Sequence, residues 1–435
     1  MGGRASPRAH YPDPVTEASA SSLQAAPEGP DIHTLSITVT GDDRPGVTGT
    51  LLGALSGAGA EVLDMQQVVV QGHLTLTLLL RPGQNVERLR DAAAVAAHRL
   101  GLVLTVSEGS GDNARPRQGR AAVVVLGAPL RADAVSLVTT RIAEHGANID
   151  RIRRLSRYPV TTVEFDISGA DVPSLRTELA LVATSEGIDI AVAPGGLARR
   201  GRRLVVLDVD STLIQQEVIE LLAAHCGREA EVAEVTARAM AGELDFEESL
   251  RARVATLSGL PASVLDEVRA AVELTPGART LVRTLKRLGF TVGLVCGGFI
   301  EIVGALADDL GIDHARANRL EIEDGRLTGR VVGEVVDRAG KARALREFAE
   351  QEGLPLSRTV AIGDGANDLD MLDVAGLGVA INAKPNVQEQ AQTSVNVPYL
   401  DSVLYLLGIS REEIEEADLD DGTPTHAPPV PHTPH

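Results

Sequence analysis

The sequence RRLVVLDVDST, residues 202–212, decides how the larger part of this chain folds. The run that ends at Leu207 is continuously apolar, as is typical of a strand that is buried on both faces of a parallel sheet. Two aspartates, Asp208 and Asp210, follow directly. Because α/β sheets bind ligands in the crevice beyond the carboxyl ends of their strands, this stretch predicts a site that begins at Asp208.

Three later segments supply polar groups in similar places. GLVCGG (293–298) reads as a second strand followed by a turn of small residues, and Lys341 opens a predicted helix. VAIGDGANDLDML (360–372) combines a strand with a glycine-rich turn that carries the acids Asp364 and Asp368. A parallel sheet would bring these strand ends together, so the sequence predicts one site built from several distant segments.

These segments resemble the haloacid dehalogenase-like phosphatases, and among them the family that hydrolyses phosphoserine. The resemblance covers residues 202–408 and includes DVDSTLIQQEVIELLA (208–223) and ARAMAGELDFEESLRARV (237–254). It implies an α/β fold with a Rossmann-like parallel sheet and a helical cap formed by about 214–275. It also implies hydrolysis of O-phospho-L-serine to L-serine and phosphate through an aspartyl-phosphate intermediate, as the last step of serine biosynthesis.

The resemblance implies catalytic roles for three residues. Asp208 would attack phosphorus as the nucleophile, and Asp210 would act as general acid and base. Lys341 would neutralise charge on the phosphoryl group and would bind substrate. The metal ligands would be Asp208, the backbone carbonyl of Asp210, Asp364 and Asp368, a set of hard oxygens that suits Mg²⁺.

The resemblance also implies a substrate-binding set: Glu217, Phe246, Arg253, Cys296, Gly297, Lys341 and Asn367. Glu217 would face the substrate ammonium, and Arg253 would bind the substrate carboxylate through paired hydrogen bonds. Phe246 would exclude water from the site. A second interpretation stays open, in which Glu217 and Arg253 are charges on a helix surface and Phe246 belongs to the core.

One of the two cysteines, Cys296, lies within the second predicted strand end. A cysteine-type phosphatase would need an arginine six residues later, where this chain has Ile302. A thiolate is also too soft a ligand for Mg²⁺. In the resembling family this position is usually Ser or Thr, so we predict that the thiol replaces a hydroxyl that donates to a phosphoryl oxygen. A thiol is the weaker donor.

The chain before residue 200 predicts two copies of a β-α-β-β-α-β pattern, which is ferredoxin-like. The first copy, 32–109, carries GDDRPGV (41–47) and resembles an ACT domain. The second copy, 120–196, has GAPLRAD (127–133) in that place. A glycine-bearing turn before a helix offers free N–H groups to a carboxylate, which favours an amino-acid effector. The two modules are also expected to assemble a homodimer. Dimerisation or packing without any ligand is the alternative.

The amino-acid composition restricts the partners and the cellular location that we expect for this protein. The net charge of −19 argues against nucleic acid or an anionic membrane as a partner, and no run approaches the ~20 apolar residues of a membrane span. Two cysteines indicate a reduced, cytoplasmic protein. The phosphatase-like part is expected at 200–410, and polar composition predicts disordered tails at 1–31 and 411–435.

Two other functions remain compatible with the sequence. One is a phosphatase of the same fold that acts on another phosphomonoester or on a phosphoprotein. The other is an amino-acid-sensing regulator with a weak phosphatase domain. The intact acid pairs and Lys341 favour an active enzyme over a regulator. Arg253 distinguishes between the possible substrates, because only a substrate with a free carboxylate needs this arginine.

Overall fold

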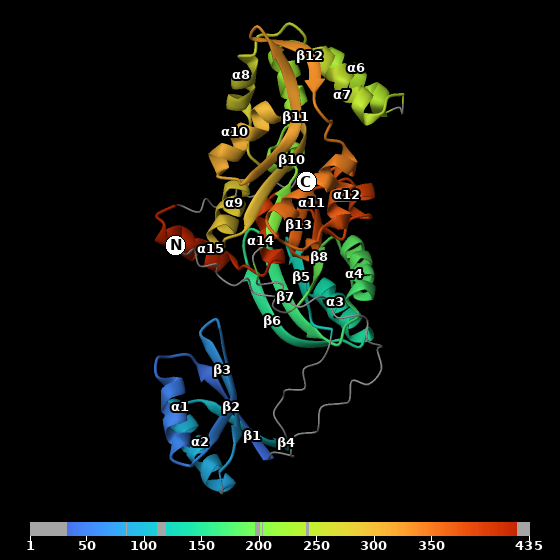
Figure 1. Ribbon diagram of the computed structural model, residues 1–435. Coiled ribbons are helices and arrows are strands. Elements are labelled where there is room, and N and C mark those ends of the chain that lie inside the picture. Colours follow the sequence, from blue (N-terminus) through green and yellow to red (C-terminus); the bar gives the residue numbers. More distant parts are fainter. Residues whose placement is uncertain are drawn as a thin grey trace, which may run out of the picture. The chain divides into compact units, whose positions relative to one another are not determined.

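The computed structural model describes residues 33–83, 85–110, 119–195, 201, 203–240 and 243–423. The chain divides into two compact units, Met1–Pro116 and Arg117–His435, and each is described by itself (Figure 1). The predicted tail at 1–31 and the last part of the other tail, 424–435, lie outside the described residues. Among the residues described, no helix has both the length and the apolar character to cross a membrane.

The first unit is a single ferredoxin-like domain, as predicted. Its antiparallel sheet has the order β2-β3-β1-β4, and leucine, isoleucine and valine alternate with hydroxyl residues along its central strands. The apolar side chains pack on α1 and α2. The elements are β1 (His33–Asp42), α1 (Val47–Ser56), β2 (Glu61–Val70), β3 (His73–Arg81), α2 (Val86–Leu100) and β4 (Val103–Ser110).

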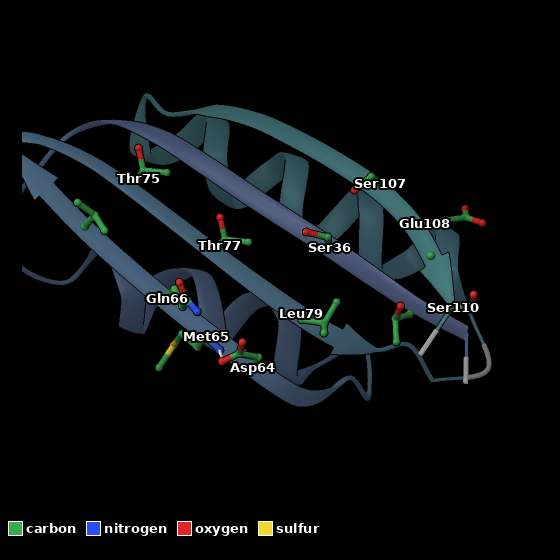
Figure 2. Close-up of a pocket in the computed structure, with 13 residues that line it drawn as sticks. Ser36, Asp64, Met65, Gln66, Thr75, Thr77, Leu79, Ser107, Glu108 and Ser110 are labelled. Carbon is green, nitrogen blue, oxygen red and sulfur yellow. Dashed lines mark hydrogen bonds between the residues drawn. The ribbon is translucent and has the colours of Figure 1, made fainter. Parts of the chain in front are cut away.

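The opposite face of this sheet carries short polar side chains. Figure 2 shows Ser36, Thr75, Thr77 and Ser107 projecting from it, where they help to line a hollow of about 470 Å³ together with Asp64. Hydroxyl groups of neighbouring strands meet here across the sheet. This face is therefore polar, whereas the face toward the helices is an apolar core.

The second unit begins with a repeat of the same fold. Its sheet has the order β6-β7-β5-β8, with two helices on one face (Figure 1). The elements are β5 (Ala121–Gly127), α3 (Ala132–Glu144), β6 (Asn148–Ser156), β7 (Thr161–Ser168), α4 (Val172–Glu186) and β8 (Asp189–Pro194).

The other face of this second sheet is buried against the rest of the unit. Val124 and Leu126 of β5 and Ala191 of β8 belong to the same apolar core as the phosphatase-like domain. At the rim, both carboxylate oxygens of Asp189 accept hydrogen bonds from Asn396, each at 2.8 Å. The face turned away from the helices therefore differs between the two copies: in the first it lines a polar hollow, and in the second it contributes apolar side chains to a shared core.

The phosphatase-like domain is built on a seven-stranded sheet with the order β12-β11-β10-β9-β13-β14-β15. All its neighbouring strands are parallel except β12, which pairs antiparallel with β11. β9 lies at the centre and is fully buried, as its apolar sequence predicts. The strands are β9 (Leu204–Leu207), β10 (Thr291–Phe299), β11 (His314–Glu323), β12 (Arg326–Val332), β13 (Thr359–Gly363), β14 (Leu377–Ile381) and β15 (Thr393–Val395).

Helices separate these strands along the chain and cover the sheet. They are α9 (Ala278–Arg287), α10 (Ile300–Leu310), α11 (Arg338–Gln351), α12 (Leu369–Val374), α13 (Pro385–Gln388) and α14 (Val403–Leu406). Between β9 and α9 stand the four helices of the predicted cap: α5 (Val218–His225), α6 (Glu229–Met240), α7 (Phe246–Ala255) and α8 (Val264–Ala271). The chain leaves for the cap and returns from it side by side, because Ile214 pairs with Leu274.

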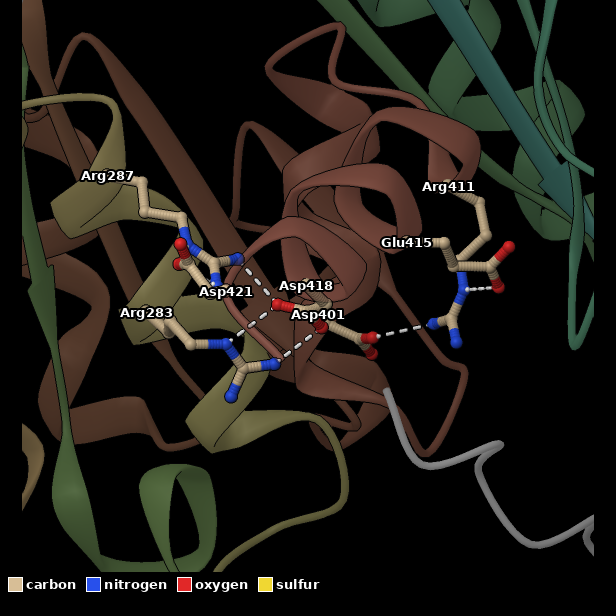
Figure 3. A network of polar contacts seen from close by, with 7 residues as sticks. All are labelled: Arg283, Arg287, Asp401, Arg411, Glu415, Asp418 and Asp421. Atoms are coloured by element: carbon tan, nitrogen blue, oxygen red, sulfur yellow. Dashed lines mark hydrogen bonds and ion pairs between the residues drawn. The ribbon is translucent and has the colours of Figure 1, made fainter. Parts of the chain in front are cut away.

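The acidic segment at 411–421 was predicted to be disordered, and this prediction is wrong. The segment forms α15 (Arg411–Asp420), which starts with a capping box between Ser410 and Glu413. Ile414 is buried in the core, and Asp418 on the same face is buried between Arg283 and Arg287 of α9 (Figure 3). Charge alone suggested solvent exposure, but residues four apart share one helix face, and the tertiary structure supplies counter-ions to it.

The buried carboxylate of Asp418 should matter more for stability than exposed acids near α9. We expect Asp418→Ala to lower the free energy of unfolding by about 3 to 5 kcal/mol, because it leaves two arginines without their buried partner. Asp309→Ala is the matched control, since Asp309 pairs with Arg279 of the same helix and both side chains are more than half exposed. Its effect should stay within about 1 kcal/mol. Equal losses in thermal or urea unfolding would contradict this role of α15.

Candidate active site

The predicted site residues do converge at the carboxyl ends of three adjacent strands. β9 lies between β10 and β13, and Asp208, Gly297 and Asp364 follow or end these strands. The backbone N–H of Asp208 extends the sheet by donating to the carbonyl of Ile362 at 2.9 Å. Parallel pairing therefore brings together groups that are more than 150 residues apart in sequence.

A buried lysine holds two buried acids together at this edge. Nζ of Lys341, in the first turn of α11, lies 2.8 Å from Oδ2 of Asp208 and 2.7 Å from Oδ1 of Asp368. None of the three side chains is more than 4% exposed. Burial lowers the pKa of Lys341, but the charges of Asp208 and Asp368 outweigh it and raise the pKa overall. The lysine is therefore a fixed positive charge.

Carboxylates outnumber this one ammonium group. Oxygens of Asp208, Asp364 and Asp368 lie within 4.8 Å of one another. Burial first, and the charge of Asp368 second, raise the pKa of Asp208 well above its usual value. Asp364 accepts a hydrogen bond of 2.9 Å from Thr212 Oγ1, and burial raises its pKa to about 6. Uncompensated negative charge on hard oxygen ligands is what a divalent cation requires, so the residues present fit such an ion.

Asp210 is aimed by an unusual turn, Val209–Leu213 (η2), in which Ser211 has left-handed backbone angles (φ 56°, ψ 3°). One oxygen of Asp210 accepts from the N–H of Val218 at 3.1 Å, at the start of α5. The other lies 3.4 Å from Cys296 Sγ. Burial, followed by the charge of Glu217, raises the pKa of Asp210 to about 7. A carboxyl group of this kind can both give and take a proton near neutral pH.

A small pocket of about 150 Å³ opens in front of these acids. Phe246 and Arg253, from α7 of the cap, and Glu217, at the start of α5, close it from the cap side. Burial lowers the pKa of Arg253, and the nearby charge of Glu217 opposes that shift. The predicted residues that line the pocket are Asp208, Asp210, Glu217, Phe246, Arg253, Gly297, Asp364 and Asn367.

The other predicted residues lie behind the pocket wall. Lys341, Asp368 and Cys296 are fully buried. The Cys296 sulfur accepts the N–H of Gly298 at 3.0 Å and contacts Asp210, and burial and the charge of Asp210 raise the pKa of the thiol. The thiol is therefore protonated and can donate to Asp210. Its predicted bond to a phosphoryl oxygen stays a prediction.

Sequence reasoning missed several residues of the site. Thr212, which donates to Asp364, lies two residues after Asp210, so its position was a usable signal. Ile219 and Leu250 line the pocket but are apolar helix residues, and nothing in the sequence separates them from ordinary core. Asn318 of β11 bonds to the Gly297 carbonyl, and no local pattern marks it.

The chain is similar to known families over nearly all its described length. Residues 205–373 match haloacid dehalogenase-like hydrolases, and 33–107 and 119–193 each match the ACT domain. A phosphoserine phosphatase of Streptomyces coelicolor is 60% identical over 397 residues, which are 91% of this chain and 97% of that protein. A phosphoserine phosphatase of Mycobacterium tuberculosis is 53% identical over 391 residues, 88% of this chain and 95% of that one.

A solved structure agrees with this similarity. The structure of a probable phosphoserine phosphatase from Vibrio cholerae, in its unliganded form, has a TM-score of 0.53 and 36% identity to this chain. The match covers 69% of this chain and 88% of that one. The likeness therefore extends beyond the catalytic sheet.

The buried ammonium of Lys341 should be needed for stability in the absence of metal. With EDTA present, we expect Lys341→Met to lower the free energy of unfolding by about 3 to 5 kcal/mol, because Asp208 and Asp368 lose their shared counter-ion. Lys286→Met is the matched control, since its partner Asp313 and Lys286 itself are each about one-third exposed. That change should cost about 1 kcal/mol or less. A neutral Lys341→Met would show that the two carboxyls are already uncharged in the fold.

Proposed function

This chain belongs to the phosphoserine phosphatases of the haloacid dehalogenase-like hydrolases, and on that premise we propose how its residues hydrolyse O-phospho-L-serine. The products are L-serine and phosphate, and the reaction is the last step of serine biosynthesis. One observation supports free phosphoserine above other substrates. A single small pocket is lined by Asp208 and Asp210, which suit the chemistry of a phosphate ester, and by Glu217 and Arg253. The negative charge of Glu217 complements the ammonium of an amino acid, and the positive charge of Arg253 complements its carboxylate.

Asp208 is the proposed nucleophile. An oxygen of its carboxylate attacks phosphorus, the bond from phosphorus to the serine oxygen breaks, and an aspartyl-phosphate forms. Asp210 gives its proton to the departing serine oxygen and later takes a proton from the water that releases phosphate. The contacts of the two aspartates support this division of roles. Lys341 binds Asp208, whereas Asp210 faces the cap.

Charge neutralisation is the second requirement, because the substrate phosphate is a dianion. Lys341 supplies one fixed positive charge from behind the pocket wall. Asp208, the backbone carbonyl of Asp210, Asp364 and Asp368 are the proposed ligands of a Mg²⁺ ion, which when bound would offset negative charge on the phosphoryl oxygens. The clustering of three of these carboxylates supports this ligand set.

Substrate choice follows from the cap. Glu217 is proposed to face the ammonium of phosphoserine and Arg253 its carboxylate, while Phe246 and Leu250 exclude water. Asn367 and Gly297 are proposed to hold substrate oxygens from the opposite wall. The small volume of the pocket argues against the alternative of a phosphoprotein, whose loop would have to enter it.

The two ACT domains are proposed to sense an amino acid and to assemble a homodimer. In the first copy, Gly46 has left-handed backbone angles and directly precedes α1. The first N–H groups of a helix have no carbonyl partner within the helix, so those of α1 could bind a carboxylate. The second copy lacks this sequence and uses its outer sheet face for packing. Calorimetric titration with L-serine would measure whether this amino acid binds as the effector. A cytoplasmic location remains a prediction.

Removing the proposed nucleophile should abolish turnover. We expect Asp208→Asn to reduce phosphate release from O-phospho-L-serine by at least about 1,000-fold with Mg²⁺ present, because an amide cannot form the intermediate. Asp309→Asn, an exposed acid far from the pocket, is the control and should retain the wild-type rate. An Asp208→Asn protein with an intact rate would refute the mechanism.

Arg253 should decide between substrates with and without a carboxylate. We expect Arg253→Ala to raise KM for O-phospho-L-serine by about 10- to 100-fold, the range for one lost charge-assisted pair. KM for phosphoethanolamine, which has the ammonium but no carboxylate, should change by less than about 3-fold. Arg251→Ala is the matched control on the same helix, because Arg251 is exposed and pairs with Glu247. Equal effects on both substrates would favour a phosphatase of different specificity.

A further inference from the structure

A single peptide unit in the pocket wall is held by side chains at both of its polar atoms. The carbonyl of Gly297 accepts a hydrogen bond of 2.8 Å from Nδ2 of Asn318, and the N–H of Gly298, which belongs to the same peptide, donates to Cys296 Sγ at 3.0 Å. Gly297 and Gly298 both line the substrate pocket, whereas Asn318 is 1% exposed and lies outside it. The carbonyl is thus directed away from the substrate.

Regular sheet pairing does not supply this restraint. The register between β10 and β11 shifts between Val295 and Phe299, so the peptide lies where the ladder is interrupted. Both flanking residues are glycines, whose backbone angles are the least restricted. A side chain at Gly298 would also collide with the site, because its Cβ would lie 3.0 Å from Asp210 Oδ2. The backbone therefore restrains this peptide less than a regular strand would, and the two side-chain bonds add to that restraint.

The orientation of the Asn318 amide is fixed by its other partner. The N–H of Val336 lies 2.8 Å from Oδ1 of Asn318, and a backbone N–H can only donate. The amide oxygen must therefore face Val336, and the amide nitrogen must face the Gly297 carbonyl. Val336 leads into α11, which carries Lys341, so one buried amide joins the β10 turn to the segment before that helix.

We propose that Asn318 is a positioning residue for the phosphatase reaction, which keeps the Gly297–Gly298 peptide from turning its carbonyl toward Cys296 and Asp210. A reversed peptide would place a partial negative charge beside the Asp210 carboxylate and the phosphoryl dianion. It would also remove the N–H that holds the Cys296 sulfur. Because sulfur is a weak acceptor, the bond from Asn318 carries most of the restraint in this chain.

The inference rests on the proposed function, and Asn318→Leu tests it. Leucine has nearly the same shape but neither donor nor acceptor. We expect kcat for O-phospho-L-serine to fall by about 10- to 100-fold, the scale for misplaced catalytic groups, while KM changes by less than about 3-fold. KM should be spared because Glu217 and Arg253, which hold the amino-acid end, are not touched by Asn318.

Two controls separate positioning from lost stability. Leu320→Ala alters another buried residue of β11 and should lower the melting temperature without changing kcat at 25 °C. Asn318→Ser, too short to reach both partners, serves if the leucine variant does not fold, and should also lose kcat. A wild-type protein without activity would refute the proposed function, whereas an active wild type with equally active Asn318 variants would refute only the role of Asn318.

A double-mutant cycle with Cys296→Ser gives the sharpest outcome. A hydroxyl is a stronger acceptor than a thiol, so serine should hold the Gly298 N–H better. We expect the kcat loss caused by Asn318→Leu to be at least about 3-fold smaller in the Cys296→Ser background, because the two side chains restrain one peptide. Identical losses in both backgrounds would mean that Asn318 acts only as a structural residue, and would overturn the proposal.

Discussion

The ammonium of Lys341, buried between Asp208 and Asp368, is the interaction on which the rest of the catalytic domain depends. Without it, these two buried carboxylates would repel each other and would protonate. Lys341 reaches them because α11 packs against β9 and β10 on one face of the sheet, so the position of the helix decides the geometry of the site. The same arrangement leaves acids in excess, which is why the residues present fit a divalent cation.

The cap turns this charged edge into a selective pocket. The catalytic turn after Asp208 contains left-handed angles at Ser211, a conformation that costs free energy and persists because its neighbours fix it. Glu217 and Ser211 bond to each other at 2.9 Å, which joins the turn to the first cap helix. Glu217 and Arg253, which are proposed to bind the two ends of the amino acid, therefore lie in a cap whose first helix is tied to the turn after Asp208.

The second ACT domain is attached to the phosphatase domain through a surface that the sequence of the repeat does not reveal. The second ACT domain contributes Val124 and Leu126 to the phosphatase core, and Asp189 bonds to Asn396 at the rim. Arg154 of β6 donates a hydrogen bond of 3.1 Å to Glu412 of α15, while Asp418 of the same helix pairs with α9. A helix near the end of the chain thus contacts both the second ACT domain and the helix that follows the cap (Figures 1 and 3).

The sequence by itself determined the elements and the chemistry. Apolar runs that lead into Asp208 and Asp364 defined parallel strands, and the two β-α-β-β-α-β patterns defined the ACT domains. Resemblance gave the charged residues that line the pocket, but not Ile219 or Leu250. Only the tertiary structure decided the folding of α15, the burial of one ACT sheet face and the hydrogen bonds of Asn318. The physical reason is common to the three. Local patterns encode period and turn chemistry, whereas counter-ions, covering surfaces and partners for a single peptide come from segments distant in sequence.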